Sequence, residues 1–105
     1  MIRKPDGTPI KILCVCGWGI GSSMMLKLLI EEVAKSMNLD IEIEHTDYTS
    51  AQAIAKQFDV IAGQEMHVEI FQNQVPAVVV IRNFVDRDPI RQQMEENLKR
   101  LGWLG

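Results

Sequence analysis

The chain has 105 residues, of which 47% are hydrophobic and 24% charged, and its net charge at pH 7 is −3. This length corresponds to one domain with room for a four- or five-stranded sheet, and it is too short for two separate cores. The acidic balance argues against nucleic acid or an anionic membrane surface as the main partner, and no apolar run reaches the ~20 residues that span a bilayer.

Residues 1–9 contain two of the four prolines and two basic residues, without an apolar stretch after them. A signal peptide would need such a stretch. We therefore expect residues 1–9 to form a loose N-terminal leader and residues 10–105 to form a single domain. There are no internal repeats or low-complexity linkers.

Residues 10–30 predict a strand, a glycine-rich turn and a helix. Lys11–Cys16 is an almost unbroken β-prone run, typical of a buried strand. Gly17–Gly21 forms the turn, and a helix is expected from Ser22 to about Met37, with Ser22 or Ser23 as its N-cap. The apolar residues that recur at helical spacing, and are therefore expected in the core, are Met24, Met25, Leu28, Leu29, Val33 and Met37.

The middle of the chain predicts an exposed strand, a short helix and a buried strand. Ile41–His45 alternates apolar and polar residues, which indicates a half-exposed strand at a sheet edge. Thr46–Ser50 reads as a polar loop, with Ser50 as the cap of a helix that continues to Lys56. Phe58–Gly63 reads as a short buried strand, and Gln64–Gln72 is weakly helical.

The last third predicts one more strand and one more helix. Ala77–Ile81 is the most β-prone run of the chain and is expected deep in the sheet. Asp86–Pro89 resembles a turn into a helix that ends at Gly102. The apolar residues of that helix at helical spacing are Ile90, Met94, Leu98 and Leu101.

Strands that alternate with helices indicate an α/β fold with a parallel sheet and right-handed crossovers. We expect an open doubly wound sheet of four parallel strands in the order 2-1-3-4, flavodoxin-like or Rossmann-like, with helices on both faces. Ligands of such folds bind beyond the carboxyl ends of the strands. Cys16, Arg82 and the loops after His45 and Gly63 fall at that edge.

The turn after the first strand has the composition of an anion site. Glycines let backbone amides approach an anion closely, and a helix start adds free N–H groups and a positive dipole end. The residues whose amides or hydroxyls are expected to bind phosphate are Gly17, Trp18, Gly19, Ile20, Gly21, Ser22 and Ser23. The dinucleotide fingerprint and the lysine of a nucleotide P-loop are both missing.

The two cysteines are expected to differ. Cys16 stands at the mouth of this turn, where the same dipoles should lower its pKa and suit the thiolate to form a phosphocysteine. Cys14 reads as a small buried core residue. A disulfide between the two would strain the strand, so both thiols are expected to be reduced.

The segment Val-Cys-Gly-Trp-Gly-Ile-Gly-Ser-Ser-Met, residues 15–24, resembles the active-site loop of the IIB components of the bacterial phosphoenolpyruvate-dependent sugar phosphotransferase system. The likeness is to the ascorbate type, with the galactitol and lactose types more distant. It continues into Val80–Phe84 and loosely covers the chain from about residue 10. Trp18 departs from the ascorbate type, where a smaller or polar residue is expected, and this leaves the substrate open.

The resemblance implies a phosphotransferase. Cys16 would take a phosphoryl group from a phosphohistidine of the IIA component and deliver it to a sugar or sugar acid, of an ascorbate-like kind, held by the membrane component IIC. The implied location is the cytoplasm, transiently at the inner face of the membrane through IIC. Neither a metal nor an organic cofactor is implied, and the oligomeric state is open.

Two other functions fit parts of the pattern. Low-molecular-weight tyrosine phosphatases and arsenate reductases of similar topology place an arginine six residues after the nucleophile, where this chain has Ser22. Asp86 or Asp88, just before Pro89, stands where such phosphatases keep a general acid. The third possibility is a non-catalytic anion-binding regulator.

Three further residues have open roles. Arg82 could bind phosphoryl oxygens or form a salt bridge with a partner, at similar odds. His45 reads as a solvated loop histidine that could contact phosphate. A metal site made of Cys14, Cys16 and a histidine lacks a recognised ligand spacing.

Overall fold

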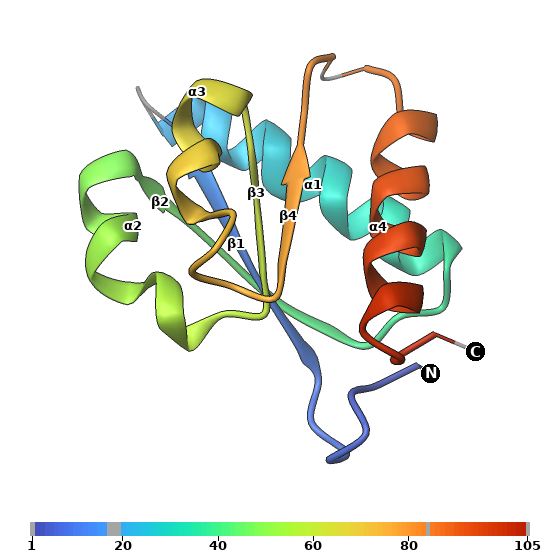
Figure 1. Cartoon of the computed structure of the whole chain (residues 1–105). Helices are drawn as coiled ribbons and strands as arrows, with labels where there is room; N and C mark the ends of the chain where they lie inside the picture. Colours follow the sequence, from blue (N-terminus) through green and yellow to red (C-terminus); the bar gives the residue numbers. More distant parts are fainter. Residues whose placement is uncertain (1, 17–19, 84, 105) are drawn as a thin grey trace.

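The computed structural model of the chain describes residues 2–16, 20–83 and 85–104, and the side chains of residues 16 and 20–23 lie outside what it describes. A parallel four-stranded sheet in the order β2-β1-β3-β4 forms its centre (Figure 1). The strands are β1 (Ile10–Cys16), β2 (Ile41–Asp47), β3 (Val60–Gly63) and β4 (Ala77–Val80). The predicted fold class and strand order are therefore confirmed.

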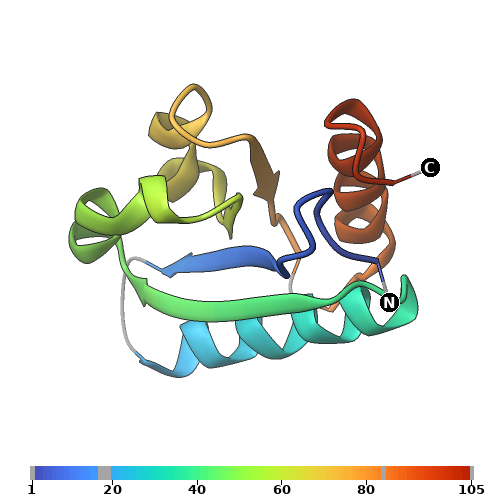
Figure 2. The same cartoon turned by 90° about the horizontal axis from the view of Figure 1, so that it is seen from below.

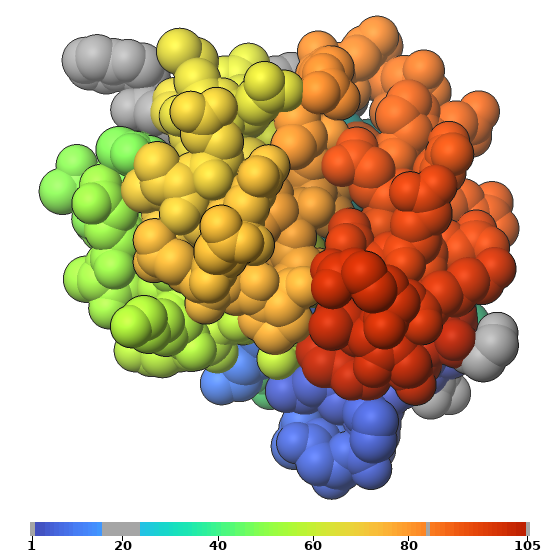
Figure 3. All heavy atoms as spheres, viewed as in Figure 1, coloured from blue at the N-terminus to red at the C-terminus, as the bar shows by residue number. Residues whose placement is uncertain are grey.

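Helices cover both faces of the sheet, as Figure 2 shows in a view along its edge. One face packs against α1 (Ile20–Ser36) and α4 (Asp88–Arg100). The other packs against α2 (Tyr48–Ile54) with the 3₁₀ turn η1 (Ala55–Gln57), and α3 (Glu65–Val68) with the 3₁₀ turn η2 (Glu69–Phe71). Side chains of these short helices and of α4 fill the surface seen in Figure 3. None of the described helices is both long and apolar enough to cross a membrane.

The central strand β1 is buried on both sides, which explains its unbroken apolar sequence. Ile10, Ile12 and Cys14 belong to the core under α1 and α4. Leu13 and Val15 belong to the core under α2 and α3. Alternate residues of a strand point to opposite faces, so one strand serves both cores.

The two edge strands, β2 and β4, differ in sequence pattern and in what bonds to their outer backbone groups. β2 alternates half-buried and exposed residues, and its predicted edge position is confirmed. β4 was expected deep in the sheet, and this is wrong, because it forms the opposite edge. The backbone N–H of Val80 donates to Oε1 of Gln93 at 2.8 Å, and Nε2 of Gln93 donates to the Val80 carbonyl at 2.7 Å. This side chain of α4 takes the place of a neighbouring strand, so the covered edge tolerates the sequence of a central strand.

Helix α1 begins earlier than expected and buries a different stripe. It starts at Ile20, so Ser22 and Ser23 lie in its first turn and are not the N-cap. Met24, Met25 and Leu28 were expected in the core but are 42%, 57% and 55% exposed. The residues that α1 buries are Leu26, Leu29, Ile30, Val33 and Ala34. Two apolar stripes at helical spacing share this helix, and only one of them can face the sheet.

The connection from β2 to α2 also differs from the expected loop over Thr46–Ser50. β2 continues to Asp47, which pairs with Cys16 of β1, and α2 starts at the next residue. The side chain of Asp47 accepts a hydrogen bond from the backbone N–H of Ser50 at 2.6 Å. Asp47 is therefore the N-cap, and Ser50, which was expected to cap the helix, supplies the capped amide.

The N-terminal segment, expected to be a loose leader, is attached to the body of the domain. The backbone N–H of Ile2 donates to the Asn38 carbonyl at 2.8 Å, and the Asp40 N–H donates to the Ile2 carbonyl at 2.8 Å. Lys4 and Asp59 form an ion pair at 2.9 Å in which both side chains are largely buried. These contacts extend the amino edge of the sheet.

The last helix follows the prediction closely. Ile90, Met94 and Leu98 are at most 1% exposed and anchor α4 on the sheet. The helix ends before Gly102, whose φ of +78° is the left-handed conformation common after a helix C-terminus. The exposed face of this helix carries an ion pair, since Nζ of Lys99 lies 2.9 Å from Oε1 of Glu95.

Candidate functional site

The carboxyl ends of the four strands bring the predicted site residues to one edge, at the top of Figure 1. Cys16, the last residue of β1, pairs with Asp47, the last residue of β2. On the other side of β1, Val15 pairs with Gly63, which in turn pairs with Val80. Residues at the carboxyl ends of all four strands thus form a row, in which Cys16 ends the inner strand β1.

The link between β1 and α1 is short. β1 ends at Cys16 and α1 begins at Ile20, so three residues connect the two elements. Gly17, Trp18 and Gly19, which were expected to bind phosphate, lie outside the described residues. Ile20–Ser23 forms the first turn of α1, where backbone N–H groups have no partner within the helix.

This helix start is suited to an anion. The 17 residues of α1 direct the positive end of the helix dipole toward the carboxyl edge. Its first turn, which includes Gly21, Ser22 and Ser23, has no acidic side chain that would compensate that charge. An anion near the end of β1 would therefore be stabilised by free amides and by the dipole together.

Gly63 allows β3 to pass close to the end of β1. A Cβ atom on Gly63 would lie 2.6 Å from the carbonyl oxygen of Val15 and 3.0 Å from Cγ1 of Val68. The first distance is shorter than real Cβ contacts, so only glycine fits here without a shift of the backbone. The sequence predicted a strand that ends on glycine, and this close approach to the residue before Cys16 is the reason for it.

Cys14 is a core residue, as predicted. It is fully buried in the core under α1, and burial raises the pKa of its thiol to about 12. The charged form of a thiol is disfavoured where water is excluded. Cys14 is consequently protonated at neutral pH and is not suited to act as a nucleophile.

Arg82 follows β4 at the same edge and is paired within the chain. Its Nη2 lies 2.8 Å from Oε2 of Glu65 in α3, with the two side chains 73% and 57% exposed. Such an exposed pair contributes little to stability, so the guanidinium can exchange its partner at small cost. Neither of the two expected roles, phosphate binding or a salt bridge to a partner, is seen directly.

The segment after Arg82 encloses a small cavity. Its volume is about 120 Å³, and its lining includes Arg82, Asp86, Pro89 and Gln93. This volume is below the ~300–1,000 Å³ that is usual for small-molecule sites. Oδ1 of Asp86 accepts a hydrogen bond from the backbone N–H of Asp88 at 3.2 Å, which is a local turn contact.

His67 is a residue of this edge that the sequence did not single out. It lies in α3, after β3, and its Nδ1 atom is buried without a hydrogen-bond partner among the residues that the structure describes. Its ring centroid is 6.1 Å from that of Tyr48, the first residue of α2. His45, expected in a solvated loop, instead lies within β2 and pairs with Cys14. Only the position of His67 after a strand could have pointed to it.

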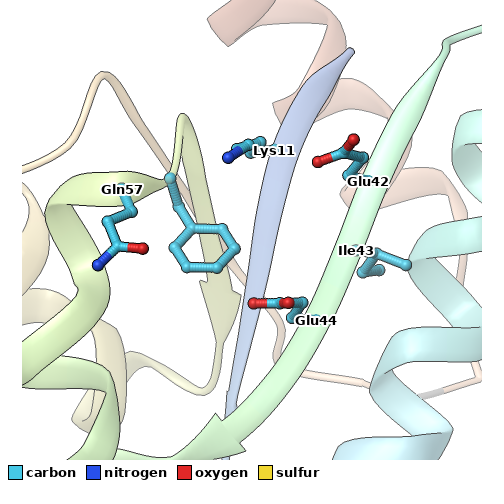
Figure 4. Close-up of a pocket in the computed structure, with 6 residues that line it drawn as sticks. Lys11, Glu42, Ile43, Glu44 and Gln57 are labelled. Atoms are coloured by element: carbon cyan, nitrogen blue, oxygen red, sulfur yellow. The ribbon is translucent and has the colours of Figure 1, made fainter.

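A second hollow lies away from this edge, near the beginning of β1. Its volume is about 390 Å³ (Figure 4). Glu42 and Glu44 point from β2 into it, on the same side of the sheet as Lys11, whereas Ile43 points to the other side. Gln57 and Phe58 complete the lining. Its mixed charges are exposed, and none of the predicted site residues contributes to it.

Comparison with known proteins agrees with the resemblance found in the sequence. The family model described as the lactose/cellobiose specific IIB subunit of the PTS system matches residues 11–96. The ascorbate-specific PTS system EIIB component of Mycoplasma pneumoniae is 23% identical over 90 residues, which cover 85% of this chain and 95% of that protein.

A solved structure shows the same fold. The lactose-specific IIB component domain of the phosphoenolpyruvate:carbohydrate phosphotransferase system from Streptococcus pneumoniae superposes with a TM-score of 0.55 at 20% identity. The match covers 90% of this chain and 95% of that one. Since the family model spans most of the chain, the chain belongs to the family of lactose/cellobiose specific IIB subunits of the PTS system.

Proposed function

We propose that this member of the IIB family carries a phosphoryl group on Cys16. The group would come from a phosphohistidine of the IIA component and pass to a sugar or sugar acid bound by the membrane component IIC. The observation that carries the proposal is the position of Cys16, which ends the central strand four positions before the first residue of α1. A nucleophile and an anion-binding helix start are thereby joined in one short segment.

The first step is a transfer from nitrogen to sulfur. The Cys16 thiolate attacks phosphorus, the S–P bond forms as the N–P bond breaks, and the donor ring takes the electron pair. With a proton on its other nitrogen, the ring leaves as neutral imidazole. Negative charge stays on the three phosphoryl oxygens throughout. The amides of Ile20, Gly21, Ser22 and Ser23, with those of Gly17, Trp18 and Gly19, would bind these oxygens.

The second step returns the thiolate. A hydroxyl of the sugar attacks phosphorus, its proton passes to a base or to solvent, and the S–P bond breaks. A thiol of lowered pKa is a good leaving group, so the same dipoles that activate Cys16 favour this release. The protein would act in the cytoplasm and meet IIC at the inner face of the membrane. The ascorbate-specific relative supports an ascorbate-like substrate.

Arg82 would assist by electrostatics. It follows β4 at the edge where Cys16 ends β1, and its exposed pair with Glu65 leaves the guanidinium free to turn toward a phosphoryl group. The planar guanidinium of arginine can bind two oxygens of a phosphoryl group through two parallel hydrogen bonds.

A hydrolase of the phosphatase type is the main competing function. Ser22 stands six residues after Cys16, where such enzymes need an arginine, and it lies in the first turn of α1. Asp86 and Asp88 contact each other in a local turn, which favours no acid role for either. Without the arginine, a persistent phosphocysteine is favoured over its hydrolysis.

Mass spectrometry separates these functions. The intact protein is incubated with phosphoenolpyruvate, the general components of the phosphotransferase system and a IIA component of the ascorbate type. Wild type and Cys14→Ser should gain one acid-labile phosphoryl group, and Cys16→Ser should gain none. No adduct on wild type would contradict the carrier function. Turnover of a generic aryl phosphate that requires Cys16 would indicate a hydrolase. Absence of phosphoryl uptake, with anion binding that is unchanged in Cys16→Ser, would indicate a regulator.

A further inference from the structure

The outer side of β2 offers a row of backbone groups to a further strand. The strand order places β2 at an edge of the sheet, with α1 on one side of it and α2 on the other (Figure 2). The backbone N–H of Ile10 donates to the Asp40 carbonyl at 2.9 Å. Successive residues of a strand direct their backbone groups to alternate sides, so Ile41, Ile43 and His45 direct theirs away from β1. In the described part of the chain, no backbone group outside the sheet bonds to these three residues.

Two carboxylates accompany these outward backbone groups. Glu42 and Glu44 are exposed and point from β2 into the hollow of about 390 Å³, on the α2 side of the sheet (Figure 4). The ion pairs of the described residues involve neither of them. The hollow thus has two carboxylates against one ammonium group, that of Lys11. We call the outward backbone of residues 41–45 and these two carboxylates the β2 edge.

The hollow has room for the side chains of an added strand. Phe58, which is 7% exposed, and Gln57 line it from the segment that follows α2. The side chains of a strand added beside β2 would alternate between the two faces of the sheet, and those on the α2 side would meet the hollow. Recognition by strand addition uses backbone hydrogen bonds for affinity and such pockets for specificity.

A second copy of the chain is a poor occupant of the β2 edge. An antiparallel pair of copies centred on Ile43 sets Glu42 and Glu44 of the two copies opposite each other. A pair centred on either glutamate sets that residue opposite itself. Like charges directly opposite each other across two strands are destabilising. The β2 edge therefore disfavours self-pairing and favours a strand that carries positive charge.

Building on the proposed function, we propose that the β2 edge is the docking site for an extended, lysine- or arginine-bearing segment of the membrane component IIC. The segment would add as a fifth strand that bonds to the outward backbone groups of residues 41–45. Its basic side chains at alternate positions would reach Glu42 and Glu44. Cytoplasmic loops of membrane proteins carry an excess of lysine and arginine, which complements these carboxylates.

The place of the β2 edge favours the receiving component over the donor as the occupant. Asp47, which pairs with Cys16, lies three residues beyond Glu44, or about 10 Å along the strand. A segment bound along residues 41–45 therefore lies beside the end of β1 without covering it. The donor IIA could contact Cys16 while the protein stays attached to IIC. Attachment through both steps serves the component that receives the group, whereas the donor needs only a brief contact.

The test uses a double variant, Glu42→Lys with Glu44→Lys. Lysine is common on exposed edge strands, so β2 should form as before. The matched control is Glu69→Lys with Glu96→Lys, which changes the net charge equally at exposed positions in η2 and α4. Binding is measured at low ionic strength by sedimentation with phosphatidylcholine vesicles that contain a IIC component of the ascorbate type. Vesicles of the same lipid without IIC give the background.

We expect the double variant to bind the IIC vesicles at least about tenfold more weakly than wild type, because lysines would repel the basic segment. The control should stay within about twofold of wild type. Amide hydrogen exchange of residues 41–45 in wild type should slow on IIC vesicles and not on empty ones. Equal affinities of wild type and double variant, or unchanged exchange, would overturn the docking site.

Phosphoryl uptake from phosphorylated IIA, measured without vesicles, separates the docking site from the proposed function. Wild type, double variant and control should take up the group at equal rates. Slower uptake by the double variant with unchanged vesicle binding would assign the β2 edge to the donor and overturn the proposal. Protection of residues 41–45 that grows with protein concentration in the absence of vesicles would assign it to a second copy, with the same consequence. Wild type that gains the phosphoryl group but does not bind IIC vesicles would overturn the docking site alone, and wild type that does neither would overturn both.

Discussion

The amino and carboxyl ends of the strands, called here the amino edge and the carboxyl edge of the sheet, differ in how their polar groups are bonded. At the amino edge, Oδ2 of Asp59 accepts the backbone N–H of Lys11 at 2.9 Å and pairs with Nζ of Lys4 at 2.9 Å. At the carboxyl edge, Arg82 forms an exposed pair with Glu65, and Nδ1 of His67 has no hydrogen-bond partner within the described part of the chain. The polar groups of the amino edge join distant parts of the chain, whereas Arg82 and His67 add little to the fold. Under the proposed function, phosphoryl uptake should depend on the carboxyl edge and not on the amino edge.

Gly63→Ala tests the close approach of β3 to β1 at the carboxyl edge, and it has the largest expected effect on stability. The new Cβ would lie 2.6 Å from the Val15 carbonyl, so the ends of β1 and β3 must move apart. We expect a loss of about 2–3 kcal/mol in the free energy of unfolding, together with slower phosphoryl uptake, since Cys16 follows Val15 directly. Urea unfolding and the transfer assay measure both. A wild-type free energy of unfolding together with a wild-type rate of phosphoryl uptake would show that the ends of β1 and β3 can accommodate the added methyl group.

Asp59→Ala tests the amino edge. It removes the acceptor for the Lys11 amide and the partner of Lys4, and we expect a loss of about 1.5–3 kcal/mol in the free energy of unfolding. Lys4→Gln is the matched control, because it removes the ion pair and keeps the hydrogen bond from the Lys11 backbone N–H to Asp59. Its loss in the free energy of unfolding should be smaller. Phosphoryl uptake by the folded fraction should stay unchanged in both. A selective loss of uptake would contradict the separation of the two edges.

Asp47→Ala tests the cap of α2 at the carboxyl edge through its pH dependence. The backbone N–H of Ser50 lowers the pKa of Asp47 below its ordinary value of 3.8. A lowered folded-state pKa means that this stabilisation is present above about pH 4 and lost as the pH falls through the lower folded-state value. We expect the variant to melt a few degrees below wild type at pH 7, with the difference vanishing near pH 2.

Asp47→Asn is the control for this experiment, since it keeps a cap acceptor without a titrating carboxyl. Its Tm should lie between those of wild type and Asp47→Ala at neutral pH. A constant Tm difference between wild type and Asp47→Ala down to pH 2 would contradict the assignment of the effect to the carboxylate.

Arg82→Ala should have the smallest effect on stability, about 0.5 kcal/mol or less, because its pair with Glu65 is exposed. The rate of phosphoryl uptake should nevertheless fall if the guanidinium helps to hold the phosphoryl oxygens, and Glu65→Gln should not reduce it. Transfer kinetics with both variants compare these roles. An uptake rate in Arg82→Ala equal to that of wild type would contradict a role of Arg82 in binding the phosphoryl oxygens.

The sequence predicted the strand order and the row of strand ends because burial on both faces leaves a clear signal, as in Lys11–Cys16. It placed Met24, Met25 and Leu28 in the core because they are apolar, although the same face of the helix continues with the charged residues Glu31, Glu32 and Lys35. The face that stays apolar along the helix is the one that meets the sheet. The predicted order placed β4 at an edge, whereas its β-prone composition suggested a position deep in the sheet; the side chain of Gln93, which replaces a neighbouring strand, accounts for that composition.

Long-range contacts account for the remaining differences. Asp47 could be recognised as a cap only once its pairing with Cys16 extended β2 past His45. The bridge between Ile2 and Leu39 joins parts of the chain that no local pattern connects. The chemistry of the candidate site was more readable, since a cysteine, glycines and serines in one short run need no distant partner to indicate an anion-binding turn.

The rate of thiol alkylation as a function of pH tests the central claim most directly, because β1 contains both a buried and a terminal cysteine. Cys14, with its pKa raised to about 12, should react only after unfolding. For Cys16 in the Cys14→Ala variant, we expect an inflection clearly below the free-thiol pKa of ~8.5, since the start of α1 stabilises the thiolate. An inflection at or above ~8.5 would contradict an activated Cys16 and the carrier mechanism that depends on it.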